Sequence, residues 1–122
     1  MSPEVLAALR DDLTIDITTI GRRTGEPRRI EIWYLHIDGR FFITGTPGPR
    51  HWLANLRANP RFTFHLKETV TVDLEAVATE VRDEATRTMV IDHAVAQWYR
   101  EQTDRHHLIA AAPMVEVTFP GA

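Results

Sequence analysis

The segment Thr18–Arg29 carries the side chains best suited to chemistry in this sequence. Four arginines, two glycines and a proline lie there between apolar, β-branched stretches. Guanidinium groups crowded at one hairpin end repel one another, yet each offers paired donors that match the oxygens of a phosphate or carboxylate. Gly21 and Gly25 let the backbone bend with its N–H groups exposed, which adds donors for the same ligand. The spacing predicts an anion site, and the alternative is a solvated basic loop tip.

The distribution of charge favours the anion site. The formal net charge is −3, but residues 21–67 hold nine basic and three acidic side chains, whereas residues from 68 onward hold four basic and ten acidic ones. The first half therefore carries a positive field suited to a small anionic ligand. A dedicated nucleic-acid binder is usually basic overall, so we expect no nucleic-acid partner.

Length and composition limit the class of protein. The 122 residues are 43% hydrophobic and 25% charged and include no cysteine. We expect one domain over residues 1–122, with no disulfide, thiolate metal site or cysteine nucleophile. No apolar run reaches about 18 residues, so we expect no membrane span. Met1–Asp12 contains charged side chains and no apolar core, which argues against a secretory signal and for a cytoplasmic protein.

The first half of the chain shows strand patterns around the arginine segment. Pro3–Leu9 has the spacing of a short amphipathic helix, and Leu13–Ile20 alternates apolar and polar residues like a half-buried strand. Arg29–Ile37 is apolar on both faces, which predicts a barrel wall that also meets a helix, a ligand or a second subunit. Asp38-Gly39 predicts a tight turn into a strand at Arg40–Thr44.

The second half adds the remaining elements of a small barrel. We expect an irregular loop at Gly45–Pro49, a helix at Arg50–Ala58, strands at Arg61–Lys67 and Val70–Val81, a main helix at Glu84–Gln102, and a closing strand at His106–Ile109 and Met114–Phe119. The absence of strand–helix–strand alternation favours an antiparallel sheet. The predicted fold class is mainly β (α+β): a split β-barrel of about six antiparallel strands with a long helix packed against it.

Two sequence blocks resemble one family. The first is Thr19–Gly25 with Arg28 behind it, and the second is the loop Gly45–Arg50 followed by Trp52–Pro60. Together they resemble the deazaflavin-dependent nitroreductase family of split β-barrel oxidoreductases, which is related in fold to pyridoxamine-phosphate oxidase-like FMN proteins. The resemblance covers roughly residues 13–66.

The resemblance implies that the chain binds coenzyme F420 and handles hydride transfer at the deazaflavin ring. By position, the arginine loop and Arg50 hold the phosphate, Trp52 and Asn55 begin a helix that lies against the coenzyme, and the loop backbone approaches the ring. The implied cofactor-binding residues are Arg22, Arg23, Thr24, Arg28, Thr44, Gly45, Thr46, Arg50, His51, Trp52 and Asn55. F420 carries a phosphodiester and a polyglutamate tail, which fits clustered guanidinium groups.

Several points separate this sequence from the family pattern or stay open. Family members often have proline at Glu31, and a serine with a longer loop where this chain has Thr44–Pro49; Thr44 or Thr46 is the substitute hydroxyl donor. No catalytic residue is identified, and no metal site is predicted, because the six histidines lack ligand spacing. Trp98 and Tyr99 suit either the core or a substrate wall.

Three functions remain for comparison. The first is an F420-dependent oxidoreductase that acts on a small unsaturated, quinone-like or nitro compound. The second is an FMN-binding split-barrel oxidoreductase, and the third is a non-enzymatic binder of a fatty acid or haem. The arginine loop favours the first two, because an apolar ligand does not need four arginines. We also expect a homodimer, because the two-faced apolar strand needs further cover.

Overall fold

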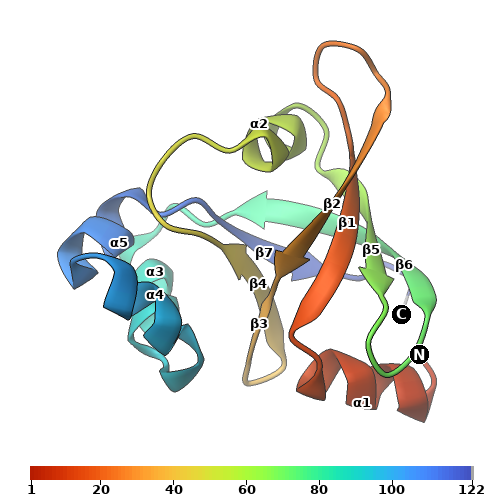
Figure 1. Cartoon of the computed structure of the whole chain (residues 1–122), viewed down its shortest axis with the longest axis horizontal. Helices are drawn as coiled ribbons and strands as arrows, with labels where there is room; N and C mark the ends of the chain where they lie inside the picture. Colours follow the sequence, from red (N-terminus) through yellow and green to blue (C-terminus); the bar gives the residue numbers. More distant parts are fainter. Residues whose placement is uncertain (122) are drawn as a thin grey trace.

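The computed structural model, which describes residues 1–121, contains one curled sheet of seven antiparallel strands in the order β2-β1-β5-β6-β7-β4-β3 (Figure 1). The strands are β1 (Thr14–Ile20), β2 (Pro27–Trp33), β3 (Leu35–Ile37), β4 (Arg40–Thr44), β5 (Arg61–Leu66), β6 (Val72–Glu80) and β7 (Met114–Thr118). The predicted split β-barrel is confirmed, with seven strands rather than about six.

The barrel closes because β2 and β3 are successive pieces of one stretch of chain. The sequence predicts a single strand over Arg29–Ile37, but Tyr34 interrupts it, so that β2 pairs with β1 and β3 pairs with β4. The Tyr34 hydroxyl donates to the carbonyl oxygens of Ala8 (3.1 Å) and Leu9 (2.7 Å), near the end of helix α1 (Pro3–Asp11). The inward turn of this side chain breaks the ladder and brings both ends of the sheet together.

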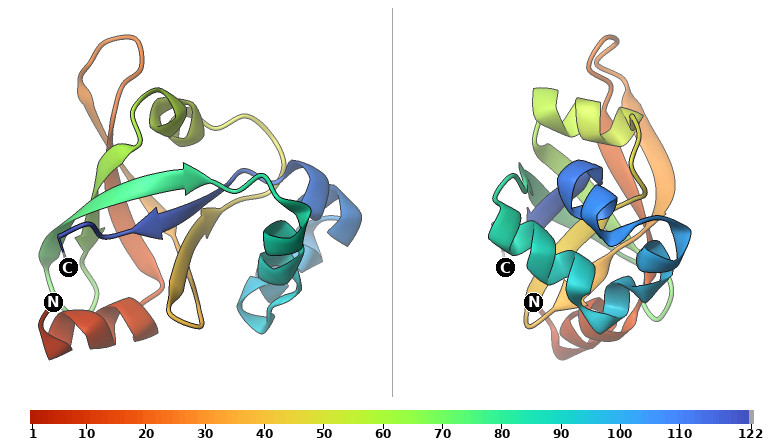
Figure 2. Two further views of the ribbon diagram at one scale, coloured as in Figure 1. Left: turned by 180° about the vertical axis from the view of Figure 1, so that it is seen from behind. Right: turned by 90° about the vertical axis from the view of Figure 1, so that its left-hand side faces the viewer.

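Two apolar clusters fill the molecule. The inner cluster lies between the strands, α1 and helix α2 (His51–Ala58), and it includes the buried alternate residues Ile15 and Ile17 of β1, as the strand pattern predicts. The outer cluster lies between the strands β3, β4 and β7 and the late helices, which gather at one end of the molecule (Figure 2). Neighbouring residues of β4 serve both clusters, because Phe42 packs in the outer one and Ile43 in the inner one.

The long helix predicted at Glu84–Gln102 is broken. It consists of α3 (Glu84–Asp92), a 3-10 turn η1 (Ala94–Ala96) and α4 (Gln97–Gln102). His93 has an extended backbone, and its Nδ1 accepts a hydrogen bond from the Val95 N–H at 3.2 Å. Arg100 Nη1 donates to the carbonyl oxygens of Ile91 (2.6 Å) and His93 (2.7 Å), which satisfies groups that a continuous helix would use internally.

The strand predicted at His106–Ile109 is also wrong. These residues belong to helix α5 (Arg105–Ala111), which Asp104 caps by accepting a hydrogen bond from the His107 N–H at 3.1 Å. Leu108 packs in the outer cluster, as does Ala112 one turn later. Within residues 1–121, no helix is long and apolar enough to cross a membrane.

We expect Tyr34→Phe to destabilise the protein by about 1–3 kcal/mol, because the buried Leu9 carbonyl oxygen loses its hydroxyl donor and the Ala8 carbonyl oxygen keeps only the Asp12 N–H. Urea unfolding would measure this, with Tyr99→Phe as the control, since the Tyr99 hydroxyl has no hydrogen-bond partner within residues 1–121.

Burial raises the pKa of the Tyr34 phenol. The stability that neutral Tyr34 provides is therefore present below about pH 10, where an unfolded tyrosine begins to ionise, and is lost as the pH rises further. Equal unfolding free energies for Tyr34→Phe and wild type would contradict the anchoring role.

Candidate functional site

The loop between β1 and β2 is held together by hydrogen bonds between its own backbone groups. The Gly21 N–H donates to the Glu26 carbonyl oxygen, and the Gly25 N–H donates to the Gly21 carbonyl oxygen, each at 2.8 Å. The Arg22 N–H donates to Asn55 Oδ1 at 3.1 Å. The prediction that the glycines leave their N–H groups exposed is therefore wrong: the loop needs these donors to keep its shape. What it offers a ligand is the arginine side chains.

Asn55 fixes one of those side chains. Its Oδ1 also accepts from Arg22 Nη1 at 3.1 Å, and its Nδ2 donates to Thr19 Oγ1 at 3.2 Å. Asn55 and Thr19 are only 4% and 2% exposed. Asn55 thus ties helix α2 to β1 and to the arginine loop.

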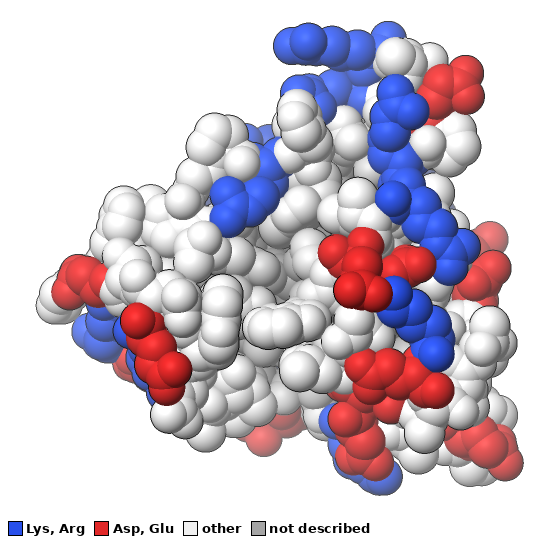
Figure 3. All heavy atoms as spheres, viewed as in Figure 1, with Lys and Arg blue, Asp and Glu red and all other residues white. Residues whose placement is uncertain are grey.

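The positive charge of the loop is largely uncompensated. Within residues 1–121, no carboxylate forms an ion pair with Arg22, Arg23, Arg28 or Arg50. Arg29, the fourth arginine of the segment, differs, because its Nε lies 3.0 Å from Asp16 Oδ2. Lys and Arg side chains gather over this hairpin at the top of the face in Figure 3, and mainly uncharged atoms lie across its centre. Such a cluster suits an anionic ligand.

The start of α2 adds a second attraction for an anion. Arg50 is the N-cap residue, no side chain among residues 1–121 caps the helix, and its first turn has no acidic residue. The free N–H groups and the helix dipole both favour negative charge there.

Arg50 also shapes the loop that precedes α2. Its Nη2 donates to the Thr46 carbonyl oxygen at 2.8 Å, and its Nη1 donates to the Pro49 carbonyl oxygen at 3.1 Å. Gly48 has a φ of 139°, and a Cβ atom built there would lie 3.2 Å from Arg50 Nη1. A side chain at this position would strain the backbone and press on the guanidinium group.

Two cavities meet at this point. One of about 610 Å³, here the arginine cavity, is lined by Thr19, Gly21, Arg22, Arg23, Thr24, Arg28, Ile30, Arg50, His51, Trp52 and Asn55. The other, of about 400 Å³, here the tryptophan cavity, is lined by Ile30, Glu31, Ile32, Trp33, Thr44, Gly45, Thr46, Arg50, Trp52, Trp98 and Tyr99. They share Ile30, Arg50 and Trp52. Each of the eleven residues named from the family resemblance lines one cavity or the other.

The hydroxyl groups in the tryptophan cavity are not equivalent. Thr44 is buried, and its Oγ1 donates to the Pro113 carbonyl oxygen at 2.7 Å, so its proton is used within the protein. Thr46 Oγ1 accepts from Arg50 Nη2 at 3.1 Å, and its own proton has no acceptor within residues 1–121. In the arginine cavity, His51 is exposed, and its Nδ1 lies 3.4 Å from Arg22 Nη2.

An aromatic wall completes the tryptophan cavity, and the sequence indicates only part of it. Trp33 and Trp98 meet edge to face, with ring centroids 5.4 Å apart, and Tyr99 lies against Trp98 at 5.2 Å. Tyr99 is buried, whereas Trp98 is 46% and Trp33 39% exposed. Trp33 is absent from the predicted site. The one signal for it is the two-faced apolar pattern of its strand, which leaves one face to be covered by something else.

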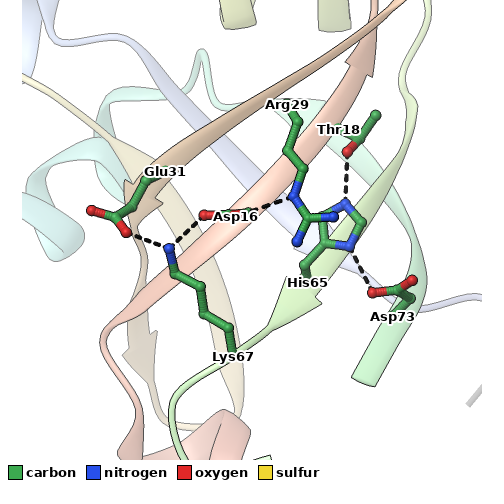
Figure 4. A network of polar contacts seen from close by, with 7 residues as sticks. All are labelled: Asp16, Thr18, Arg29, Glu31, His65, Lys67 and Asp73. Carbon is green, nitrogen blue, oxygen red and sulfur yellow. Dashed lines mark hydrogen bonds and ion pairs between the residues drawn. The ribbon is translucent and has the colours of Figure 1, made fainter. Parts of the chain in front are cut away.

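A network of charges lies on the outer side of the sheet, and its residues line neither cavity apart from Glu31 (Figure 4). Lys67 Nζ lies 2.6 Å from Asp16 Oδ1 and also contacts the Glu31 carboxylate, while Arg29 approaches Asp16 from the other side. The hydrogen bond from Lys67 holds the pKa of Asp16 below its usual value, with a further contribution from Arg29. The network ties together β1, β2 and the end of β5.

We expect Asp16→Asn to lower the melting temperature at pH 7 by a few degrees, since Asp16 carries most of this network. A carboxyl whose pKa is lowered in the folded state stabilises the protein above its unfolded pKa of about 4 and loses that effect as the pH falls. Thermal melts of the variant and wild type should therefore converge at about pH 2–3. Glu75→Gln is the control, because Glu75 is an exposed residue of β6 whose carboxylate forms no ion pair within residues 1–121. A difference in melting temperature that persists in acid would contradict this account.

His65 has partners that its sequence spacing does not reveal. Its Nδ1 lies 2.7 Å from Asp73 Oδ1, and its Nε2 lies 2.6 Å from Thr18 Oγ1. The three residues come from neighbouring strands, so only the sheet register brings them together. Within residues 1–121, no group of three or more histidine or acidic side chains is placed to hold a metal ion.

Comparisons with known proteins identify the family. The family model for F420H2-dependent quinone reductase matches residues 6–117. Among solved structures, an F420H2-dependent reductase is 19% identical with a TM-score of 0.58, over 88% of this chain and 95% of that one. A FAD-binding protein from Mesorhizobium loti is 17% identical with a TM-score of 0.72, over 98% of this chain and 90% of that one.

A third similar structure has the name of a different family. It is a general stress protein 26-related protein of the pyridoxinephosphate oxidase family from Clostridium acetobutylicum, 16% identical with a TM-score of 0.70, over 95% of this chain and 81% of that one. At these identities the structures show the shared fold alone. The family model covers nearly the whole chain, and the chain therefore belongs to the F420H2-dependent quinone reductase family, whose members are oxidoreductases that use coenzyme F420.

Proposed function

We propose that this protein reduces a small, flat quinone-like compound, with the phosphate of F420 in the arginine cavity and the deazaflavin ring in the tryptophan cavity. One observation carries the proposal: arginines that have no carboxylate partner within residues 1–121, and a helix start that no side chain in this range caps, lie beside a cavity walled by aromatic rings. The two kinds of lining match the two halves of the coenzyme, one anionic and one flat and largely apolar.

The arginines divide the work of holding the phosphate. Arg23 and Arg28 are exposed and donate to the anion, since neither has an acidic partner within residues 1–121. Arg22 is held by Asn55 and so presents its remaining N–H groups in a fixed direction. Arg50 lines both cavities, and its hydrogen bonds to the Thr46 and Pro49 carbonyl oxygens would keep the preceding loop beside the ring. A phosphate bound this way is attracted by the positive charges and oriented by the hydrogen bonds.

The tryptophan cavity would position the deazaflavin ring and the substrate against an apolar surface. F420H2, when bound, supplies a hydride to the substrate. Trp52, Trp33 and Trp98 exclude water and present apolar faces to a flat conjugated ring. The Thr46 hydroxyl can donate a hydrogen bond to an oxygen of the substrate or the ring, because its own proton has no acceptor within residues 1–121. A nitro compound satisfies the same contacts and is the second substrate class to assay.

A second copy of the chain is the proposed cover for the exposed apolar side chains near this cavity. Ile30, Trp33 and Trp98 are 39%, 39% and 46% exposed and belong to the same cavity wall. Light scattering of the purified protein, with its chain mass of 14.0 kDa, should give twice that value. A mass of one chain at micromolar concentration would rule out the dimer.

FMN is the second candidate coenzyme, because the arginine cavity fits any flavin phosphate. Fluorescence and absorbance titrations with F420, FMN and haem, side by side, distinguish the candidates. We expect tight binding of F420 and colourless protein from a host that lacks this coenzyme. Stoichiometric FMN in the purified protein would make the flavin the favoured coenzyme, and tight binding of haem alone would overturn the proposal.

A further inference from the structure

A third and larger cavity lies on the other side of α2, and the proposed function does not use it. Its volume is about 1070 Å³, and it lies between α2, the start of α3 and helix α5. Trp52 and Asn55 of α2 face the arginine cavity, whereas Leu53, Ala54 and Arg57 of the same helix line this one. We call it the helix-side cavity.

The helix-side cavity has a surplus of positive charge. Its lining includes five arginines but two carboxylates, Glu80 and Glu84. Arg57 and Arg82 share Glu80, at 2.5 Å and 3.1 Å, so this group of three keeps one positive charge. The side chains of these two arginines are 56% and 81% exposed, which leaves N–H groups of both available at the rim.

Arg87 adds a positive charge deeper in the cavity. Its guanidinium group donates to the carbonyl oxygens of Ile109 (2.5 Å), Val81 (2.9 Å) and Ala112 (2.5 Å), and it forms no ion pair within residues 1–121. Burial lowers the pKa of this guanidinium group, which arginine nevertheless keeps protonated at neutral pH. Arg105 of α5 also lines the cavity; it is paired with Asp92 at 2.5 Å, and its side chain is 43% exposed.

We infer that the helix-side cavity is a second anion site, which takes a chain of carboxylates lying across its arginines. The five arginines come from the two ends of α2, the segment after β6, α3 and α5, and charges distributed over so many elements favour an extended polyanion over a compact phosphate. Leu53, Val81 and Ile109 give the methylene groups of such a chain an apolar surface.

The site connects with the coenzyme cavities through Arg50, which lines all three, at the uncapped start of α2. Two sources of the carboxylate chain follow. One is the glutamate tail of F420 itself, which would pass around the start of α2; this source rests on the proposed function. The other is a separate polycarboxylate that binds without the coenzyme.

The test compares two forms of F420, one with several glutamates and one with none, by fluorescence titration at low salt. It also titrates apo protein with free tetraglutamate by calorimetry. The variant is Arg82→Ala/Arg105→Ala, with the single Arg82→Glu as a second variant that leaves the Arg105–Asp92 pair intact. Arg10→Ala is the matched control, since Arg10 is an ion-paired arginine with a 63% exposed side chain on α1 and lines none of the three cavities.

We expect the wild type to bind the glutamate-bearing form more tightly, by about two- to fivefold for each arginine involved. Both variants should lose this preference and the extra salt dependence while binding the tail-less form as wild type does. Binding of free tetraglutamate without a preference for tail length would assign the site to a separate polycarboxylate. Equal affinity for both forms and no binding of tetraglutamate would overturn the inference. Failure of both coenzyme forms to bind would instead remove the proposed function, and the tetraglutamate arm would still test the cavity.

Discussion

The double variant Arg23→Ala/Arg28→Ala should bind F420 about a hundredfold or more weaker than the wild type. Each arginine contributes charge-assisted hydrogen bonds of about 1.5–3 kcal/mol, and a loss of about 1.4 kcal/mol is tenfold in affinity. The melting temperature should hardly change or should rise, because the two exposed guanidinium groups repel their neighbours and have no acidic partner within residues 1–121. Fluorescence titration with F420 and thermal melts measure the two effects separately.

Arg29→Ala is the matched control for this variant. Arg29 belongs to the same segment but is paired with Asp16 on the outer side of the sheet, so its loss should lower the melting temperature and spare F420 affinity. Hydride transfer at saturating coenzyme should survive in the double variant, because the phosphate does not take part in the reaction. Lysine at both positions should give intermediate affinity, since charge remains but the two-pronged geometry is lost. Wild-type affinity in the double alanine variant would refute the assignment of the phosphate site.

Asn55→Ala should lower the free energy of unfolding by about 2–4 kcal/mol, more than any other substitution in the site. The buried amide makes three hydrogen bonds, and its removal leaves the Arg22 N–H and the Thr19 hydroxyl without their partner. For a domain of this size, the melting temperature should fall by roughly 10 °C. F420 affinity should also fall, because Arg22 is no longer held in position. Asn59→Ala is the control, as Asn59 accepts one hydrogen bond, from the Arg61 N–H at an exposed site.

Asn55→Asp separates the structural role of Asn55 from its effect on the ligand. A carboxylate keeps both acceptor contacts with Arg22 and can accept from the Thr19 hydroxyl, so most of the stability should return. It also neutralises the Arg22 guanidinium group, so F420 affinity should stay low. If instead Asn55→Ala melts like the wild type, then Asn55 does not join helix α2 to the arginine loop.

The elements that the sequence predicts well are those with local causes. The turn at Asp38-Gly39 has positive φ at both residues (49° and 79°), as the dipeptide indicates, and α2 begins and ends within a residue of its predicted range. The break at His93 has no local signal of this kind, because it depends on Arg100 reaching back to two carbonyl oxygens. The strand expected at His106–Ile109 failed because a short apolar run fits a helix equally well when a cap such as Asp104 precedes it.

The same contrast applies to the site. The family resemblance names eleven residues, and all of them line the two neighbouring cavities. The resemblance could not show that the loop amides bond to one another, or that Thr44 gives its proton to the Pro113 carbonyl oxygen. Trp33 and Ile30 join the cavity wall only because β2 lies beside the loop after the barrel closes. Such contacts depend on segments that are far apart in the sequence.

The place of β7 in the sheet has a consequence for how the protein is made. This strand is the last in the chain that the structure describes, yet it lies between β4 and β6 and pairs with both. A growing chain on the ribosome therefore holds two unpaired strand edges until Thr118 has emerged, and such edges invite aggregation. The Thr44 hydroxyl, at the end of β4, also lacks its acceptor until Pro113 has been added to the chain. The edges of β4 and β6 are therefore paired only at the last stage of synthesis that the described residues define.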